Sequence, residues 1–554
     1  MSELAYSYHT FLFPFLWNDG GKTRQEDFIK VLSVGKRWFE TLWQNEKIPN
    51  GIGQTEWLQY YAAYQYFTEP ANAAIFNPRG ENVVRCFEYR HNGSTPEGGI
   101  GKYIIIKESG DYPITAELDI NNIRMHIYDS GVAIFILELE NRQHRELDAV
   151  NKINEFGRRI NMPYLVPGGA HSLCADRIEI RFGEELFEKE DYFVMLKKLG
   201  ENFNTGIAEI SLNYIMQPIQ KFIDGGGVDN GGYEVTTKAD NARKDPKKLF
   251  IKPCVDDRMF VCCLVVDGAF ANRLSKYNAA EKEYHYLTDC DMGSLNDAGI
   301  FAPDNKTISN DLYKLCYIET WVTCQSVTMK RELLKQTVYD RWIDYGTIHA
   351  MTHHSLLCVS TDEVTINAFL TEYVQLAILV LAQRATILAL SGEAATVAEG
   401  LRDDTHITPE QIGTIERLQA KYVKSQNQLL LSEATVQEQG VEIYNRIKKQ
   451  LYIDTNKAEL DSQMNNLRDV ANISNDRLEQ RNSGRLNNIL AIVSAFALVL
   501  AVLEIAPSFY SDIDFAPYRW GSIGVSIFVA AAGVGVFTCV WRLLKWLYRK
   551  IKKK

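Results

Sequence analysis

The stretch from residue 485 to residue 506, RLNNILAIVSAFALVLAVLEIA, decides the architecture of this chain of 554 residues. Its apolar part, Leu486–Ala506, and a second apolar run, Ile523–Trp541, close the sequence. As a helix, the second run would extend about 28 Å, which matches the hydrocarbon core of a bilayer. A buried core helix is the alternative reading, but two such runs flanked by charge favour two transmembrane helices.

Charge around these runs predicts their orientation. Arg477, Arg481 and Arg485 precede the first run, and seven Lys or Arg residues lie in the tail, 542–554. The connecting segment, 507–522, carries two aspartates and one arginine. The positive-inside rule then places both termini in the cytoplasm and this connecting loop outside. We therefore expect a multi-pass protein of the inner (cell) membrane.

Composition narrows the class of protein. The net charge is −10, and the basic tail supplies +7, so the rest of the chain is strongly acidic. Such a chain is poorly suited to neutralising the phosphates of a nucleic acid. Ten cysteines occur without a Cys-x-x-Cys pair, which favours reduced thiols in a cytosolic domain over a disulfide framework or a zinc site.

A long helix is expected to lead into the first membrane run. No proline lies between Pro409 and Pro507, and Thr408-Pro409 is a typical helix start. We expect a break near Asp454-Thr455-Asn456, followed by one helix of some 50 residues, or about 75 Å, that includes the first run. We assign residues 366–485 to a helical stalk. A single helix of about 75 Å is seldom stable alone, so it is expected to pack against sister subunits in a homo-oligomer.

One stripe on this helix has the spacing of a pore lining. Steps of three and four residues place these side chains on one face of the helix. The face is polar at its expected cytosolic end, has small residues in the middle and is acidic at its outer end. Packing between helices is the alternative for the small residues, whereas an acid at the hydrocarbon edge favours a pore. The residues of the stripe are Asp476, Gln480, Ser483, Asn487, Leu490, Ser494, Ala497, Ala501 and Glu504.

The N-terminal part, 1–365, is expected to be an α+β, ligand-sensing domain. Its first residues, MSELAYSYHTFLFPFLW, read as a buried strand or turn, not as a signal peptide. Strand-like alternation marks Val83–Tyr89, Lys102–Lys107, Ile123–Tyr128, Ala133–Leu139, Ile178–Phe182 and Met259–Val266. Helical patterns mark Glu146–Ile160, Tyr192–Leu199 and Ala368–Leu390, and the segment 342–357 is expected to connect this domain to the stalk.

Three places could bind an anionic ligand. Arg158-Arg159 ends a predicted helix and precedes a turn that contains Gly168 and Gly169, so guanidinium groups and a close-approaching backbone could receive a phosphate. Basic residues also favourably end a helix, which is the alternative. Asp224 stands beside a glycine-rich run and could bind a ribose hydroxyl, although a flexible linker explains that run as well. The third place is the basic run between Arg243 and Lys252, although such a run is more often a solvated face than a site.

The sequence gives no support for catalysis or for a defined metal site. His349 and His353 would be one turn apart on a predicted helix, a spacing that can hold a metal, but core or surface histidines explain them as well. Motifs of nucleophilic hydrolases and of dinucleotide-binding folds are absent. We therefore expect that the protein is not an enzyme. The sequence does not indicate which residues, if any, bind a metal.

Several local sequences resemble the CorA-like metal ion transporter family over about 370–554. They are Gln383-Arg384-Ala385 after an apolar run, Leu467-Arg468-Asp469, and the pore-helix start at Arg485–Ser494 with its Asn and hydroxyl residue. The order of domain, stalk helix, two spans and basic tail is similar too. The resemblance implies a pentamer and leaves a divalent cation open as a cofactor. The Gly-Met-Asn signature of that family is missing, because residues 504–514 read EIAPSFYSDID.

The combination of this C-terminal part with a large N-terminal part resembles the CorA-like membrane effectors associated with type III CRISPR systems. That resemblance implies an oligomeric channel in antiviral defence, opened by a nucleotide second messenger that joins S-adenosylmethionine to AMP. Two other functions stay open at this point. A constitutive divalent cation transporter would need metal selectivity without the signature, and a membrane-anchored enzyme that degrades the nucleotide would need a catalytic group.

Overall fold

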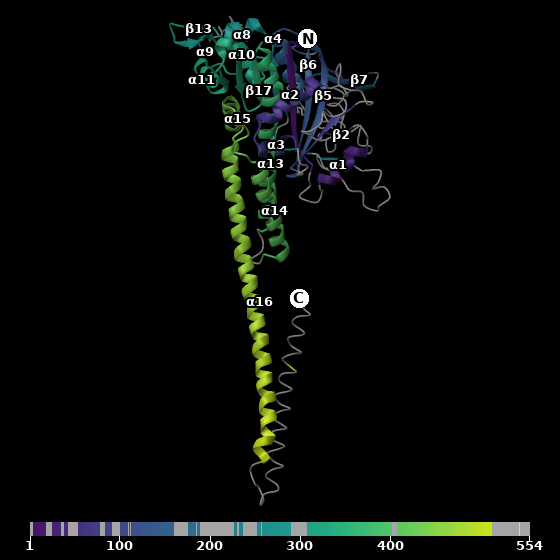
Figure 1. Cartoon of the computed structure of the whole chain (residues 1–554), viewed down its shortest axis with the longest axis vertical. Helices are drawn as coiled ribbons and strands as arrows, with labels where there is room; N and C mark the ends of the chain where they lie inside the picture. Colours follow the sequence, from purple (N-terminus) through teal and green to yellow (C-terminus); the bar gives the residue numbers. More distant parts are fainter. Residues whose placement is uncertain are drawn as a thin grey trace, which may run out of the picture. The chain divides into compact units, whose positions relative to one another are not determined.

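The computed structural model describes most of the chain in two compact units, Met1–Ala471 and Asn472–Lys554, and each is considered by itself. The N-terminal part is mixed α/β, as expected, and the C-terminal part is helical (Figure 1). The described residues are 4–17, 25–34, 38–41, 54–77, 83–90, 100–108, 110, 112–159, 175–183, 185–188, 226–229, 232–235, 252–255, 258–289, 307–401, 407–511 and 542.

A sheet of thirteen described strands forms the centre of the first unit. Its neighbouring strands pair antiparallel in the described part of the chain, apart from the parallel pair β12 and β17. Along the main path the order is β15 (Val338–Tyr339), β16 (Ile348–Met351), β17 (Ser355–Val359), β12 (Phe260–Val265), β1 (Ser7–Leu16), β6 (Val132–Asn141), β5 (Ile114–Tyr128), β4 (Gly101–Lys107), β7 (Arg177–Phe182) and β8 (Glu185–Glu188).

Short strands complete the β-structure. β3 (Val84–Tyr89) pairs with β5 and with β2 (Trp38–Glu40), and β11 (Lys252–Pro253) pairs with β1. Two hairpins stand apart from the sheet: β9 (Gly226–Asp229) with β10 (Gly232–Val235), and β13 (Tyr277–Asn278) with β14 (Glu283–Tyr284). The six strands expected from alternation are all confirmed; five have ends shifted by at most two residues, whereas β5 begins at Ile114, nine residues before its expected start.

β1 lies in the middle of the sheet, which confirms the expected buried strand near the N-terminus. Because successive side chains of a strand point to opposite faces, β1 contributes to two cores. Phe11, Phe13 and Phe15 join the main core together with residues of α4 (Leu147–Gly157). Leu16 packs in a second core with residues of α13 (Val374–Glu399). The sheet therefore carries helices on both faces.

Further helices surround this sheet. They are α1 (Gln25–Val34), α2 (Gln54–Tyr66), α3 (Glu69–Ile75), α8 (Gly268–Leu274), α9 (His285–Thr288), α10 (Ile308–Tyr317), α11 (Val327–Thr337) and α12 (Glu363–Ala368). The segment 342–357, expected as a connection, instead holds β16 and the start of β17. The expected helix Glu146–Ile160 is confirmed as α4, and the one at Tyr192–Leu199 lies outside the described residues.

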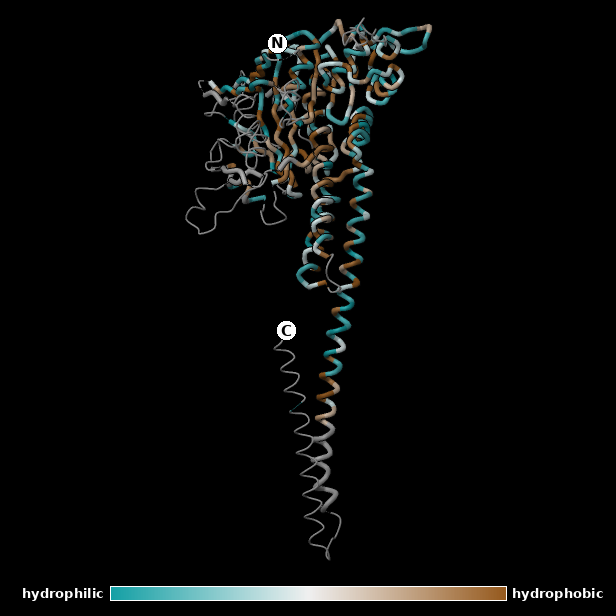
Figure 2. Tube along the Cα trace, turned by 180° about the vertical axis from the view of Figure 1, so that it is seen from behind, coloured by the Kyte–Doolittle hydropathy of each residue, from teal (hydrophilic) through white to brown (hydrophobic). Residues whose placement is uncertain are grey.

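α13 is the most apolar helix of the first unit. With α12 and one π-helical turn, Phe369–Tyr373, it forms a continuous helix over Glu363–Glu399. Among the described residues this is the one helix long and apolar enough to cross a bilayer, with a mean hydropathy of 1.7. However, 83% of that apolar stretch is buried inside the protein, as expected for a core helix. Figure 2 shows hydrophobic residues concentrated in the strands and in this helix.

Three helices follow α13. α14 (Pro409–Gln428) begins with the expected cap, where the Thr408 hydroxyl accepts from the backbone N–H of Gln411. α15 (Glu438–Gln450) and α16 (Ile453–Ser511) follow. The expected break near Asp454 lies slightly earlier, at residues 451 and 452, and a second break at 429–437 was not expected. Helices α13–α15, which lie in the segment assigned to the stalk from the sequence, belong to the first compact unit.

The second unit begins within α16, which continues for 59 residues in total. Along this helix the residues change from mainly hydrophilic to mainly hydrophobic (Figure 2). In its first part, Leu460, Met464 and Leu467 are buried, whereas large apolar side chains further along are exposed, among them Leu486, Ile489, Leu490, Val493 and Phe496. From residue 498 the backbone alone is described, and the second expected span, Ile523–Trp541, lies outside the described residues together with most of 507–522 and of the basic tail.

Candidate ligand-binding site

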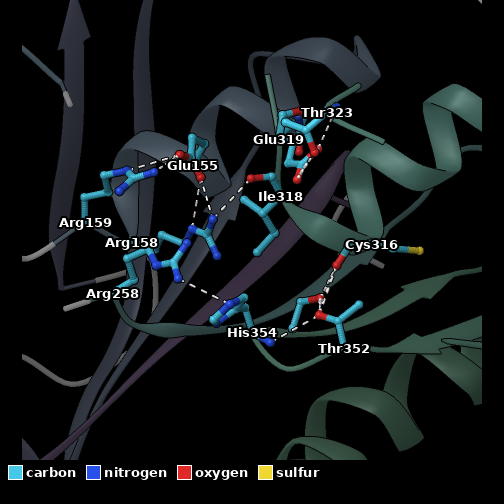
Figure 3. Close-up of polar contacts among 12 residues, drawn as sticks. Glu155, Arg158, Arg159, Arg258, Cys316, Ile318, Glu319, Thr323, Thr352 and His354 are labelled. Carbon is cyan, nitrogen blue, oxygen red and sulfur yellow. Dashed lines mark hydrogen bonds and ion pairs between the residues drawn. The ribbon is translucent and has the colours of Figure 1, made fainter. Parts of the chain in front are cut away.

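The arginine pair expected to receive a phosphate lies at the C-terminal end of α4 and turns back onto that helix (Figure 3). Arg158 donates from Nε and Nη2 to Glu155 Oε2, at 3.1 and 2.6 Å. Arg159 donates from Nε to Glu155 Oε1 at 3.1 Å. Both guanidinium groups are thus held by one carboxylate, three and four residues earlier on the same helix, as i, i+3 and i, i+4 spacing allows.

A third arginine and a histidine extend this cluster. Arg258 pairs with Arg159 through an isolated backbone bridge and contacts His354 Nε2 through Nη2, at 3.2 Å. Arg158 Nη2 also donates to the carbonyl of Ile318, at 3.1 Å, just after α10. Figure 3 shows Arg158 between Glu155 and Arg258. The cluster therefore joins α4, the end of α10 and the segments before β12 and β17.

Electrostatics make the cluster rich in positive charge. Burial lowers the pKa of Arg158, the neighbouring Arg258 and Arg159 lower it further, and Glu155 opposes them. Burial also raises the pKa of nearby Glu319. The Glu319 carboxyl is therefore less readily ionised and neutralises the arginines less effectively. Arg158 Nη1 has no hydrogen-bond partner among the described residues, although its residue is only 1% exposed. A guanidinium group can hold an anion, but it stays protonated and does not itself act as a base.

The burial of the arginine pair decides how it can act. At 1% and 7% exposure, Arg158 and Arg159 do not present their guanidinium groups to the surface. Their contacts to Glu155 match the alternative reading, in which basic residues stabilise the end of a helix. The other residues expected at a ligand site, Gly168, Gly169 and Asp224, lie outside the described residues. The pair therefore acts as a buried structural clamp in the described part of the chain.

Sequence reasoning missed the partners of this clamp. Glu155 was visible in the sequence as an acid one helical turn before two arginines, a spacing that predicts an ion pair on one helix face. Arg258 and His354 arrive from segments about 100 and 200 residues further along the chain, so no local pattern could have indicated them.

The histidines expected on a helix are placed differently. His349 lies in β16, and His353 lies in the turn after it, so the expected helix with i, i+4 spacing is wrong. His349 is fully buried, and its two ring nitrogens have no hydrogen-bond partner among the described residues. Burial lowers its pKa to about 3, so the ring is neutral at physiological pH. Among the described residues, no group of three His, Cys, Asp or Glu side chains could hold a metal.

The predicted pore stripe lies on α16. Asp476, Asn487, Leu490, Ser494 and Ala497 are exposed on this helix. Ala501 and Glu504 lie in the same helix, but their side chains are outside the described residues. The spacing along an unbroken helix keeps the stripe on one face, whereas its role as a pore lining stays a prediction.

The described cysteines are free thiols, which agrees with the expectation of reduced cysteines. They are Cys86, Cys254, Cys262, Cys263, Cys316, Cys324 and Cys358. Burial raises the pKa of several of them, including that of Cys263 to about 12, so they are protonated and poorly reactive.

Comparison with models of protein families, with curated proteins and with solved structures finds no match to this chain.

Proposed function

We propose that this chain forms a homo-oligomeric membrane channel, in which the α/β unit binds a small nucleotide and α16 carries the response into the bilayer. The observation that carries this proposal is α16 itself. It is one helix of 59 residues that begins in the first compact unit and ends in an apolar run. In that apolar run, large side chains such as Leu486 at 60% and Val493 at 58% are exposed.

Water is a poor environment for that surface. Burying apolar surface contributes about 25 cal/mol per Å², so a row of exposed large side chains on one long helix is costly unless another surface covers it. Lipid tails and sister helices both meet this need, and a single helix of this length favours association. The charge pattern of the sequence adds an orientation, with the α/β unit and the basic tail in the cytoplasm of the cell.

Opening by a ligand requires a difference in affinity. A ligand shifts a closed channel toward the open state only as far as it binds the open state more tightly. The resemblance to CRISPR-associated CorA-like effectors names the ligand, a conjugate of S-adenosylmethionine and AMP, and the antiviral role. On this proposal the protein disturbs ion balance or membrane integrity and performs no catalysis.

Leakage from liposomes tests the proposal. Purified full-length chain in vesicles loaded with a self-quenching dye should release dye when the conjugate is added, and little without it. Ala497→Trp, on the predicted pore face, should block release, because a large ring fills a narrow path. Ile492→Trp, on the opposite face of the same helix, is the matched control and should leave release intact.

Other outcomes contradict the proposal. Equal blockage by both tryptophans would place the effect in folding or insertion and remove the pore assignment. Dye or metal release without any nucleotide would favour a constitutive transporter instead.

A further inference from the structure

A cleft of about 230 Å³ lies between the end of the sheet and α14. One wall is the β5–β6 turn with Tyr128, Asp129 and Ser130, next to Val83 before β3. The other wall is one face of α14 and the residue after it: Ala420, Lys421, Lys424, Ser425, Gln428 and Leu429. Its volume equals that of about eight water molecules, enough for a phosphate group and part of the molecule that carries it.

Two lysines give this cleft its chemistry. Lys424 forms an ion pair across the cleft with Asp129, and both side chains are well exposed, at 46% and 38%. Lys421 pairs with Glu393 of α13. An exposed pair such as Lys424–Asp129 contributes little net stability, so an incoming anion can take over Lys424 at small cost. Asp129 then competes with the ligand for Lys424.

Polar groups from the sheet and the helix complete the lining. Ser130 Oγ contacts Thr386 Oγ1 at 2.8 Å, which fixes the turn against α13. The Tyr128 hydroxyl is buried and has no hydrogen-bond partner among the described residues. Ser425 and Gln428 add a hydroxyl and an amide on the helix side.

We propose that this cleft binds a small ligand that bears a phosphate group. Lysine acts as a flexible point charge that suits the several oxygens of a phosphate, and it does not require the planar fit of a guanidinium to a carboxylate. The described residues that line the cleft include two lysines and no arginine. This site is distinct from the clamp at Arg158, where the guanidinium groups are buried and bound to Glu155.

α14 also connects the cleft to α16. Gln419 Nε2 donates to the carbonyl of Met464 at 3.3 Å, and the Tyr422 hydroxyl donates to Asp461. The helix that carries the two lysines therefore contacts α16 through residues next to them. A ligand that draws α14 toward the β5–β6 turn would alter these contacts. This consequence, unlike the binding itself, rests on the proposed channel function.

Calorimetry on the full-length chain in detergent tests the binding. The probes are pyrophosphate and AMP, with adenosine as the uncharged control and succinate as the dicarboxylate control. We expect pyrophosphate and AMP to bind, adenosine not to bind, and succinate to bind more weakly. Lys424→Gln and Lys421→Gln should each weaken pyrophosphate binding by about tenfold, because each removes a charged hydrogen bond. Arg417→Gln removes a charge from the same helix outside the cleft and should change it by less than about twofold.

A variant with the opposite sign keeps the test decisive if a lysine variant folds poorly. Asp129→Asn removes the competing carboxylate and should tighten pyrophosphate binding by about fivefold. Glu416→Gln, an equal charge change at an exposed site of α14, should not. Absence of pyrophosphate binding, or equal responses of the paired variants, would overturn the proposed site. Binding at the cleft without any dye release would leave the site standing and contradict the channel.

Discussion

Two apolar helices of this chain have opposite surroundings. In α13 and the helical residues before it, 83% of the most apolar stretch is buried. In the apolar part of α16, Leu486, Leu490 and Val493 are each more than half exposed. Both helices would attract a search for membrane spans, because hydropathy measures composition and ignores neighbours. The difference teaches that hydropathy alone does not distinguish an apolar helix that packs inside the protein from one whose apolar side chains are exposed.

The neighbours of α13 explain its burial. Gln383, a polar residue in the middle of this helix, donates from Nε2 to the carbonyl of Leu429 at 2.9 Å and to the Tyr444 hydroxyl at 2.8 Å. Thr386 contacts Ser130 at the end of the sheet. These buried polar side chains of α13 form hydrogen bonds within the protein, which stabilises the packing of the helix inside the first unit.

A charge introduced into each helix should separate them most strongly. Leu379→Arg places an uncompensated charge in the core and should lower the free energy of unfolding by more than about 4 kcal/mol. Ile489→Arg lies on an exposed position and should leave the unfolding of the first unit unchanged. Urea unfolding followed by the fluorescence of the α/β unit measures both. Equal losses would contradict the difference in burial between the two helices.

The buried clamp provides the next largest effect within the first unit. Glu155→Gln leaves Arg158 and Arg159 without their shared carboxylate and should cost about 3–5 kcal/mol. Glu416→Gln, which changes charge equally at an exposed site, should cost nothing measurable. If Glu155→Gln is tolerated as well, the clamp is not structural, and the arginines become free to serve a ligand.

Loss of the hydrogen bonds of Gln383 in α13 should lower the free energy of unfolding by a smaller amount. Gln383→Leu keeps the volume but removes two buried hydrogen bonds, one to the carbonyl of Leu429 and one to the Tyr444 hydroxyl, which should cost about 1–3 kcal/mol. Gln65→Leu, at an exposed position of α2, serves as the control. Thermal unfolding of both variants would measure it, and no difference between them would show that α13 is held by apolar packing alone.

Glu372, in the π-helical turn before α13, predicts a pH dependence. Burial raises its pKa to about 7, above the value of 4.5 in an unfolded chain. Between these values the folded state holds more protons than the unfolded state, so stability falls as pH rises from 4.5 to 7. Glu372→Gln should remove this slope and stabilise the protein at pH 8 by about 1–2 kcal/mol. An unchanged slope in Glu372→Gln would assign the pH dependence to other groups.

The sheet was largely predictable from local sequence, since alternation at β4, β6 and β7 reports which face is buried. Long-range pairing was not predictable. β16 and β17 read as helix or connection, because their strand form depends on β12, whose residue Val261 pairs with Ser355. The break before α15 likewise depends on the bridge between Phe67 and Thr435, which are distant in sequence.

The candidate sites divide in the same way. Arg158 and Arg159 attracted attention as a basic pair, yet Glu155 at helical spacing already indicated their partner. The cleft beside α14 was invisible to sequence reasoning, because Asp129 and Lys424 meet only when the β5–β6 turn packs near that helix. Local patterns thus predict ion pairs within a helix and miss those made between distant segments.

Flotation of reconstituted vesicles tests the central claim that the apolar end of α16 lies in a bilayer. The full-length chain should float with the vesicles after an alkaline carbonate wash, and a chain that ends at Ala471 should remain in the soluble fraction. Full-length protein that stays soluble without detergent and does not float would contradict the account.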